Sequence, residues 1–285
     1  MASKPLSLRW SSHFLDLDRR SCVMGVLNVT PDSFSDGGRF FERERAVEHG
    51  LEMAADGADI VDVGGESTRP YAEEIPVQQE LDRVLPVIQA LARELRIPIS
   101  IDTVKARVAR EALQAGASMI NDVSALRFDP EMASLAAEAG VPVVLMHMKG
   151  VPRDMQENPV YDDLMGEITG FLKAALDRAV AAGIREEKII LDPGIGFGKT
   201  FEHNLVILRD LKRFRSLGRP LLVGPSRKAF LGGILDKKAP ERETGTMAAV
   251  SAALLNGAHM VRVHNVKMAV ETAKVIDAIK RGRVK

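Results

Sequence analysis

The strongest constraint on the fold is a repeat of short apolar segments, each followed by a stretch with helical periodicity. Such segments are typical of strands buried on both faces of a parallel sheet. Glycines end several of the helical stretches, as in AAG, QAGA and EAGV, and glycine commonly ends a helix. The eight predicted strands are residues 22–27, 58–63, 97–101, 118–120, 142–146, 188–191, 220–223 and 259–263. The predicted helices are residues 42–56, 77–95, 105–115, 130–139, 164–182, 204–214, a helical region that ends near Asn256, and 267–280.

Eight strand–helix units predict an α/β protein with a single (β/α)8 TIM barrel. A doubly wound sheet is the rival architecture, but no strand is followed by GxGxxG, and polar residues mark nearly every strand end. In a barrel, the carboxyl ends of all strands converge on one face. Alternating apolar residues within 1–20 predict a small hairpin that caps one end. We therefore expect a hairpin lead-in over residues 1–20 and a barrel over 21–285.

Net charge, cysteine content and apolar runs exclude several classes of binding partner and site. Lys+Arg and Asp+Glu both number 39, so no overall field attracts nucleic acid or an anionic membrane, and we expect neither as a partner. The single cysteine, Cys22, excludes an internal disulfide and a cysteine-based zinc site. The N-terminus lacks an apolar signal region, and no apolar run approaches about 18 residues. These features predict a cytoplasmic protein in which any anion binding is local.

Two polar loops follow the first two strands. MGVLNVTPDSFSDGG places Asn28 at a strand end and Phe34 within a polar segment, where an aromatic residue argues against a plain surface turn. The second loop, DVGGESTRP, has two glycines that permit a tight turn, and Arg69 offers a planar fork for phosphate or carboxylate. Together they resemble signatures of the dihydropteroate synthase family, whose members join a dihydropterin to p-aminobenzoate in folate biosynthesis. Tyr71 departs from that pattern, which has glycine after the proline.

Three further strand ends carry an acid or amide: Asp102 in SIDT, Asn121 in INDVS and Asp192 in LDPGIGFGK. Such residues singly often cap helices, but three in succession at one barrel mouth favour a polar pocket. A dihydropterin presents ring N–H, amino and carbonyl groups in one plane, which fixed carboxylates and amides can match. The resemblance assigns these three residues to pterin recognition. The expected apolar lining consists of Ile120, Met146 and Met148.

The last three loops add aromatic and cationic groups. DPGIGFGK is one residue short of the GxxxxGK[ST] phosphate loop, so a nucleotide-triphosphate site is rejected. The resemblance instead places Phe197 against the aminobenzoate ring. In SRK, a solvated charge patch is the alternative, but the resemblance gives Lys228 to the pterin and Ser226 to the aminobenzoate. Alternation puts Arg262 and His264 on one side of the last strand, and the resemblance makes them pyrophosphate ligands.

The expected chemistry is displacement of pyrophosphate from a pterin methylene by an aromatic amine. The amine is already neutral at pH 7, so neutralisation of the leaving group should dominate catalysis. We expect Mg²⁺ as cofactor with Asn28 as its protein ligand. The expected catalytic residues are Asp102, Asp192, Lys228 and Arg262. The first two loops are expected to add Phe34, Thr68, Arg69 and Pro70 to the substrate site.

Two other functions remain open at this stage. A barrel that passes a methyl group from a reduced folate to a corrinoid would share the three pterin-binding residues, but it has no use for Arg262, His264 or STRP. A non-catalytic paralogue would be expected to have lost one of the first two loops, and both are intact. The resemblance also implies a homodimer, whereas His147 is expected to be a hydrogen-bonded scaffold residue.

Overall fold

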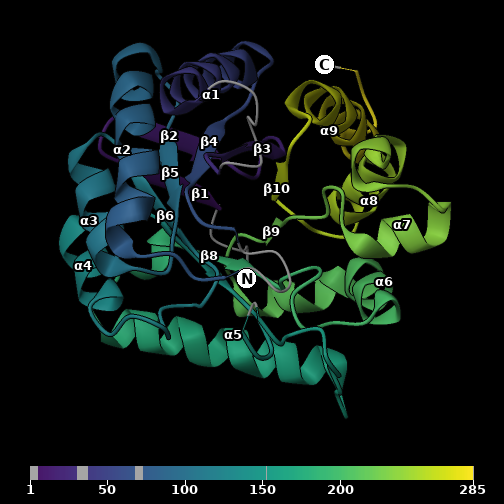
Figure 1. Cartoon of the computed structure of the whole chain (residues 1–285). Coiled ribbons are helices and arrows are strands. Elements are labelled where there is room, and N and C mark those ends of the chain that lie inside the picture. The colour runs from purple at the N-terminus through teal and green to yellow at the C-terminus, as the bar shows by residue number, and fades with distance from the viewer. Residues whose placement is uncertain (1–5, 31–37, 68–72, 152, 285) are drawn as a thin grey trace.

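The chain forms a closed barrel of eight parallel strands surrounded by helices (Figure 1). It is seen in a computed structural model that describes residues 6–30, 38–67, 73–151 and 153–284. The sheet order is β8-β7-β6-β5-β4-β3-β10-β9, and a bridge between Leu191 and Leu221 joins its two ends. The barrel strands are β3 (Cys22–Asn28), β4 (Ile60–Gly64), β5 (Ile99–Asp102), β6 (Met119–Asp122), β7 (Val143–Met146), β8 (Ile189–Asp192), β9 (Leu222–Val223) and β10 (Met260–Val263). The predicted TIM barrel is confirmed.

The helices pack outside the strands. They are α1 (Gly38–Ala55), α2 (Val77–Glu94), α3 (Ala106–Gln114), α4 (Met132–Ala139), α5 (Leu164–Ala181), α6 (Phe201–Asp210), α7 (Ala229–Leu235), α8 (Glu243–Leu255) and α9 (Val266–Arg281). The helical region predicted to end near Asn256 is two helices, because Asp236 adopts a left-handed conformation and a short 3-10 turn that contains Pro240 follows at Ala239–Glu241. In the described ranges, no helix combines the length and apolar character needed to cross a bilayer.

A hairpin closes the amino-terminal end of the barrel. Strands β1 (Ser7–Trp10) and β2 (His13–Asp16) pair antiparallel, and buried Leu8 and Trp10 face the barrel interior. The hairpin packs on the first inward-facing side chains of the barrel strands: Cys22, Met24, Ile60, Met119, Val144, Ile190, Leu222 and Met260. The predicted cap is therefore present at this end.

Side chains alternate between the two faces of each strand, as the pleat requires. On β10, Val261 and Val263 face outward into the core under the helices, whereas Met260 lies in the interior cluster. Inward positions become polar toward the carboxyl end, so Met260 is followed by Arg262, and Met119 on β6 by Asn121. An apolar floor thus supports a polar layer at the barrel mouth.

Candidate active site

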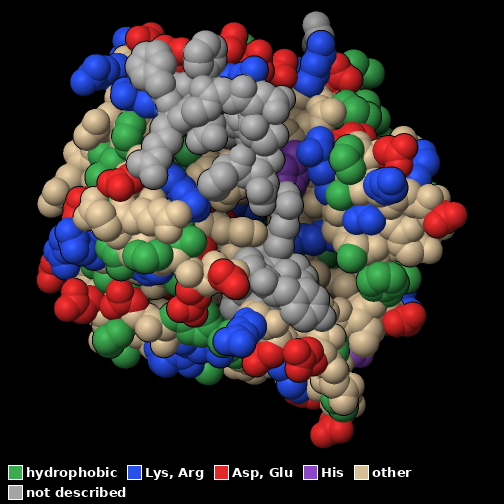
Figure 2. Space-filling model, in the orientation of Figure 1, with side chains coloured by type: hydrophobic (Ala, Val, Ile, Leu, Met, Phe, Trp, Pro, Cys, Tyr) green, Lys and Arg blue, Asp and Glu red, His purple; other side chains and the backbone are tan. Residues whose placement is uncertain are grey.

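One cavity collects the polar strand ends at the carboxyl face of the barrel. Figure 2 shows a face of the molecule that is hollowed near its centre, with basic side chains and a histidine beside the hollow. The cavity is lined by residues from all eight strand ends or the loops after them, including Asn28, Ser67, Asp102, Asn121, Met146, Asp192, Phe197, Ser226, Lys228, Arg262 and His264. The structure therefore brings together most of the residues that the sequence singled out.

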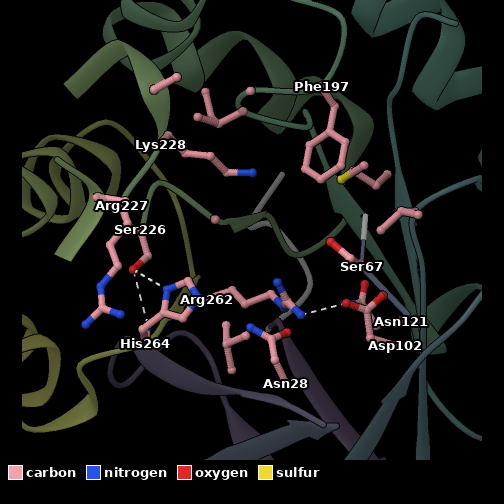
Figure 3. A pocket seen from close by; sticks show the side chains of 18 of the residues that line it. Asn28, Ser67, Asp102, Asn121, Phe197, Ser226, Arg227, Lys228, Arg262 and His264 are labelled. Carbon is pink, nitrogen blue, oxygen red and sulfur yellow. Dashed lines mark hydrogen bonds and ion pairs between the residues drawn. The ribbon is translucent and has the colours of Figure 1, made fainter. Parts of the chain in front are cut away.

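Arg262 lies at the centre of a buried ionic network (Figure 3). Its Nε donates to Asp62 Oδ2 at 2.6 Å, and its Nη2 donates to Asp102 Oδ2 at 2.7 Å. Asn121 Nδ2 donates to the same Asp62 oxygen at 3.0 Å. Asp62 is fully buried, so one carboxylate fixes an arginine from β10 and an amide from β6.

Asp62 was not assigned a role from the sequence. Alternation along β4 indicates that Asp62 faces the barrel interior, because Asp62 stands two residues after inward-facing Ile60. Arg262 stands in the same relation to Met260 on β10. A buried acid on the inner face of a barrel strand needs a cationic or donor partner.

Burial raises the pKa of both carboxyl groups predicted to bind the pterin. The pKa of Asp102 rises to about 7, mainly through burial, while Arg262 opposes the rise and Asp62 adds to it. The pKa of Asp192 rises to about 6 through burial, opposed by the Gly194 N–H, which donates to its Oδ1 at 2.7 Å. Asp102 Oδ1 is buried without a hydrogen-bond partner among the described residues. Each group can thus accept a ligand N–H and gain or lose a proton near neutral pH.

Cationic and hydroxyl groups line the opposite wall. Lys228 Nζ lies 4.1 Å from the centre of the Phe197 ring, a cation–π contact. Ser226 Oγ is 2.8 Å from His264 Nδ1 and also accepts the His264 backbone N–H at 3.2 Å. Figure 3 shows Lys228 directed toward Phe197, whereas the neighbouring Arg227 turns away and donates to Glu243 at 2.5 Å. The two adjacent cations of SRK therefore have different partners.

The apolar wall differs in part from the prediction. Met146 lines the cavity as expected, in a cluster with Val123 and Met155. Met148 is buried in the same cluster but does not line the cavity. The expectation for Ile120 was wrong, because it faces outward into the core under the helices. Alternation explains this, since its neighbours Met119 and Asn121 both face inward.

Two polar strand-end residues hold the loops. Asp122 faces away from the cavity and accepts the N–H groups of Ser124 and Leu126 at 2.7 and 2.9 Å, so it shapes the turn after β6. His147 is buried, and its Nδ1 lies 2.9 Å from Lys199 Nζ, which fits the predicted scaffold role.

Four of the predicted substrate-binding residues, Phe34, Thr68, Arg69 and Pro70, lie outside the described residues, as does Tyr71. Within the described ranges, no group of three His, Cys, Asp or Glu side chains could hold a metal ion.

Known proteins with similar sequences identify the family. The pterin binding enzyme family matches residues 24–264. A dihydropteroate synthase of Synechocystis sp. is 51% identical over 93% of this chain and 92% of that protein. The Bacillus subtilis dihydropteroate synthase is 48% identical over 93% and 90%. The chain belongs to the dihydropteroate synthase family. As a dihydropteroate synthase, it is a transferase of folate biosynthesis.

Solved dihydropteroate synthases share the fold over nearly the whole chain. A Yersinia pestis dihydropteroate synthase in a sulfonamide drug complex superposes with a TM-score of 0.92 at 45% identity, covering 96% of this chain and 99% of that one. The Xanthomonas albilineans enzyme with 4-aminobenzoic acid gives a TM-score of 0.91 at 45% identity, with coverage of 97% and 99%.

Proposed function

We propose that the site condenses 6-hydroxymethyl-7,8-dihydropterin pyrophosphate with p-aminobenzoate, giving 7,8-dihydropteroate and pyrophosphate. The observation that carries this proposal is the placing of acids and cations in one cavity, with Asp102 bonded to Arg262 at 2.7 Å. The acids would bind the N–H groups of a pterin, and the cations would bind a diphosphate. A corrinoid methyltransferase would need only the acids.

The pterin would lie between Asp102, Asn121 and Asp192. Asn121 uses its amide N–H on Asp62, so its carbonyl oxygen is oriented to accept from the ligand. Buried carboxylates bind ring N–H and amino groups strongly because no water competes for them. Burial of Met146 beside them supplies an apolar surface for the pterin ring.

The diphosphate would lie at the mouth, against Arg262, His264 and Arg69. His264 stands two residues beyond Arg262 on the same inward face, so the guanidinium and the imidazole line the same side of the cavity. Arginine suits phosphate because its planar fork donates in pairs.

Asn28 fits a magnesium site of a particular kind. Its amide lines the cavity near Arg262 and His264 (Figure 3), and it is half-buried at the end of β3. Mg²⁺ usually keeps several waters and binds through few protein oxygens together with substrate phosphates. One amide oxygen is therefore enough where the substrate carries a diphosphate. Bound there, Mg²⁺ would neutralise part of the charge of the leaving group.

The reaction breaks the bond between the pterin methylene carbon and the pyrophosphate oxygen. The aminobenzoate nitrogen then forms a bond to that carbon and loses a proton. Asp102 and Asp192 stabilise the positive charge that spreads from the methylene into the pterin, while Arg262 and Lys228 stabilise the departing anion and the incoming ring. These four residues form the proposed catalytic set.

The aminobenzoate would bind last, because its site needs groups from several loops. Phe197, Lys228 and Ser226 line its side of the cavity. Phe34, Thr68 and Pro70 are proposed to complete it once pyrophosphate has formed. Calorimetry tests this order: p-aminobenzoate should bind tightly only with pyrophosphate and Mg²⁺ present. Tight binding without pyrophosphate contradicts the scheme.

A homodimer is proposed through the later helices. Large apolar side chains are exposed there, at Phe201, Leu205, Ile234 and Leu255, and such patches often mark interfaces. Analytical ultracentrifugation at micromolar concentration tests it, and a monomer would contradict it. A cytoplasmic location stays a prediction.

The decisive experiment is pyrophosphate release from the dihydropterin pyrophosphate, with and without p-aminobenzoate. Release that depends on p-aminobenzoate, with dihydropteroate detected by mass spectrometry, supports the proposal. An Asn28→Ala variant should require a higher Mg²⁺ concentration for pyrophosphate binding in calorimetry. Absence of release from the folded wild-type protein would refute the proposed reaction.

A further inference from the structure

A buried lysine stands in the wall of the catalytic cavity, and the proposed reaction does not use it. Lys199, at the end of the connection between β8 and α6, is 2% exposed. A buried ammonium group is costly unless it is hydrogen-bonded. Lys199 Nζ donates to the Phe197 carbonyl oxygen at 2.9 Å and lies 2.9 Å from His147 Nδ1. Since an ammonium group only donates, Nδ1 accepts this bond.

The connection itself cannot hold its shape by local preference. Gly194, Gly196 and Gly198 all have positive φ, and glycine is the most permissive residue in the backbone. A Cβ atom at Gly194 would lie 1.9 Å from the His147 carbonyl oxygen, so the connection runs directly against the end of β7. Hydrogen bonds must therefore fix its conformation, and one lies within the connection, where the Phe197 N–H donates to the Gly194 carbonyl oxygen at 3.1 Å.

Several polar contacts surround the connection, but one of them anchors Phe197. Gln156 Nε2 donates to the Gly196 carbonyl at 2.6 Å, and Tyr161 Oη donates to the Gly198 carbonyl at 2.7 Å. Of these three side chains, Lys199 is the one that bonds the carbonyl of Phe197, the residue whose ring lies 4.1 Å from Lys228 Nζ. Tying that carbonyl to His147 fixes the backbone that carries the ring.

We propose that Lys199 is a positioning residue for the aminobenzoate side of the site, acting through the bond from its ammonium group to the Phe197 carbonyl and through His147. The inference rests on the proposed function, because it assumes that Phe197 meets the aminobenzoate ring. The inference gives Lys199, the lysine of DPGIGFGK, a role other than the phosphate binding of a nucleotide loop.

The charges around Lys199 make its hydrogen bonds to Phe197 and His147 sensitive to pH. Burial lowers the pKa of Lys199 to about 7, with Asp192 opposing the shift and Lys228 adding to it. Burial, Lys199, Arg127 and Lys149 lower the pKa of His147 to about 2, so His147 stays a neutral acceptor. Below pH 7 Lys199 is protonated and donates to both partners. Above pH 7 the neutral amine donates more weakly, so the KM for p-aminobenzoate should rise with pH.

The test is Lys199→Met, which keeps the apolar stem and removes the ammonium group. We expect the KM for p-aminobenzoate to rise about tenfold, the size expected for loss of a charge-assisted hydrogen bond. The Kd for dihydropterin pyrophosphate, measured by calorimetry, should change less than about twofold, because the carboxylates remain in place. The rise in KM above pH 7 should also disappear. Lys173→Met, at an exposed lysine on α5, is the matched control.

A second pair of variants keeps the inference testable if Lys199→Met does not fold. His147→Gln replaces the Nδ1 acceptor by an amide oxygen, whereas His147→Leu removes the acceptor. The leucine variant should raise the KM for p-aminobenzoate several-fold above that of the glutamine variant. Equal KM values in the pair would overturn the inference, as would an unchanged KM in a folded Lys199→Met enzyme. Equal losses for both substrates would also overturn it, because they indicate a general structural role.

These failures differ from failure of the proposed function. If wild-type protein releases no pyrophosphate, the proposed reaction is wrong. If wild-type turnover is normal and the variants leave aminobenzoate KM unchanged, only the role of Lys199 is wrong.

Discussion

Replacement of Asp62 by asparagine should weaken the site without changing its shape. Asp62 Oδ2 accepts from both Arg262 Nε and Asn121 Nδ2, and the side chain is fully buried. Asparagine keeps an oxygen acceptor but loses the charge. Hydrogen bonds to charged groups contribute about 1.5–3 kcal/mol. We therefore expect kcat/KM for dihydropterin pyrophosphate to fall about 10- to 150-fold.

The same substitution should move the pH dependence. Burial raises the pKa of Asp102 to about 7, Arg262 opposes this, and the negative charge of Asp62 contributes to the rise. Removing that like charge lowers the pKa of Asp102, so the ionised form persists to lower pH. If ionised Asp102 binds the pterin, kcat/KM of the wild-type enzyme rises with pH through about 7, and the midpoint in Asp62→Asn lies lower.

The assay is pyrophosphate release at limiting dihydropterin pyrophosphate between pH 5 and 9. Asp177→Asn, which removes an exposed carboxylate on α5, is the control and should leave both the rate and the midpoint unchanged. A kcat/KM within twofold of wild type, together with an unmoved midpoint, would refute the argument that Asp62 fixes Arg262 and Asn121.

Three other changes test separate parts of the site. Arg262→Ala should abolish pyrophosphate release while dihydropterin binding stays measurable by calorimetry; loss of the fold would instead make the arginine structural. Asp192→Asn should stabilise the ligand-free enzyme by about 3 kcal/mol at pH 7.5, because burial raises the pKa of this carboxyl from 3.8 to about 6. Wild-type stability is then lost as pH rises from about 4 to 6, and urea denaturation should show no gain for the variant at pH 3.5. Gly194→Ala should lower the free energy of unfolding by more than about 2 kcal/mol, through positive φ and the 1.9 Å approach to His147 O. Gly218→Ala, at φ +67 with no atom within 4 Å of the new Cβ, measures the backbone cost alone, and equal losses in the two variants would exclude the clash.

The barrel was predictable because each strand carries its own local signal. Short apolar runs and the glycines after the helices are readable without knowledge of tertiary contacts, and the eight strands lie where the sequence places them. The site residues at strand ends were predictable for the same reason. A residue such as Asp192 follows a buried strand directly, and barrel geometry brings it to the mouth.

What the sequence did not reveal depends on contacts between distant residues. Asp62 and Arg262 are 200 positions apart, and only the folded barrel shows that they pair. Lys199 reaches His147 across 52 positions, in a segment whose glycine spacing excluded a phosphate loop but did not indicate another role for the lysine. Ile120 lies outside the pocket because its neighbours on β6, Met119 and Asn121, face inward and alternation turns Ile120 toward the helices. α7 ends at Asp236, which has a left-handed conformation that the sequence pattern did not indicate.

The hairpin at the amino-terminal end of the barrel limits where substrates can enter and products can leave. Leu8 is fully buried and Trp10 is 4% exposed, so the barrel axis is sealed at that end. Among the described residues, the cavity therefore opens at the carboxyl end of the barrel and not through the hairpin end. In the proposed reaction, pyrophosphate and dihydropteroate therefore both leave through the mouth at the carboxyl end of the barrel.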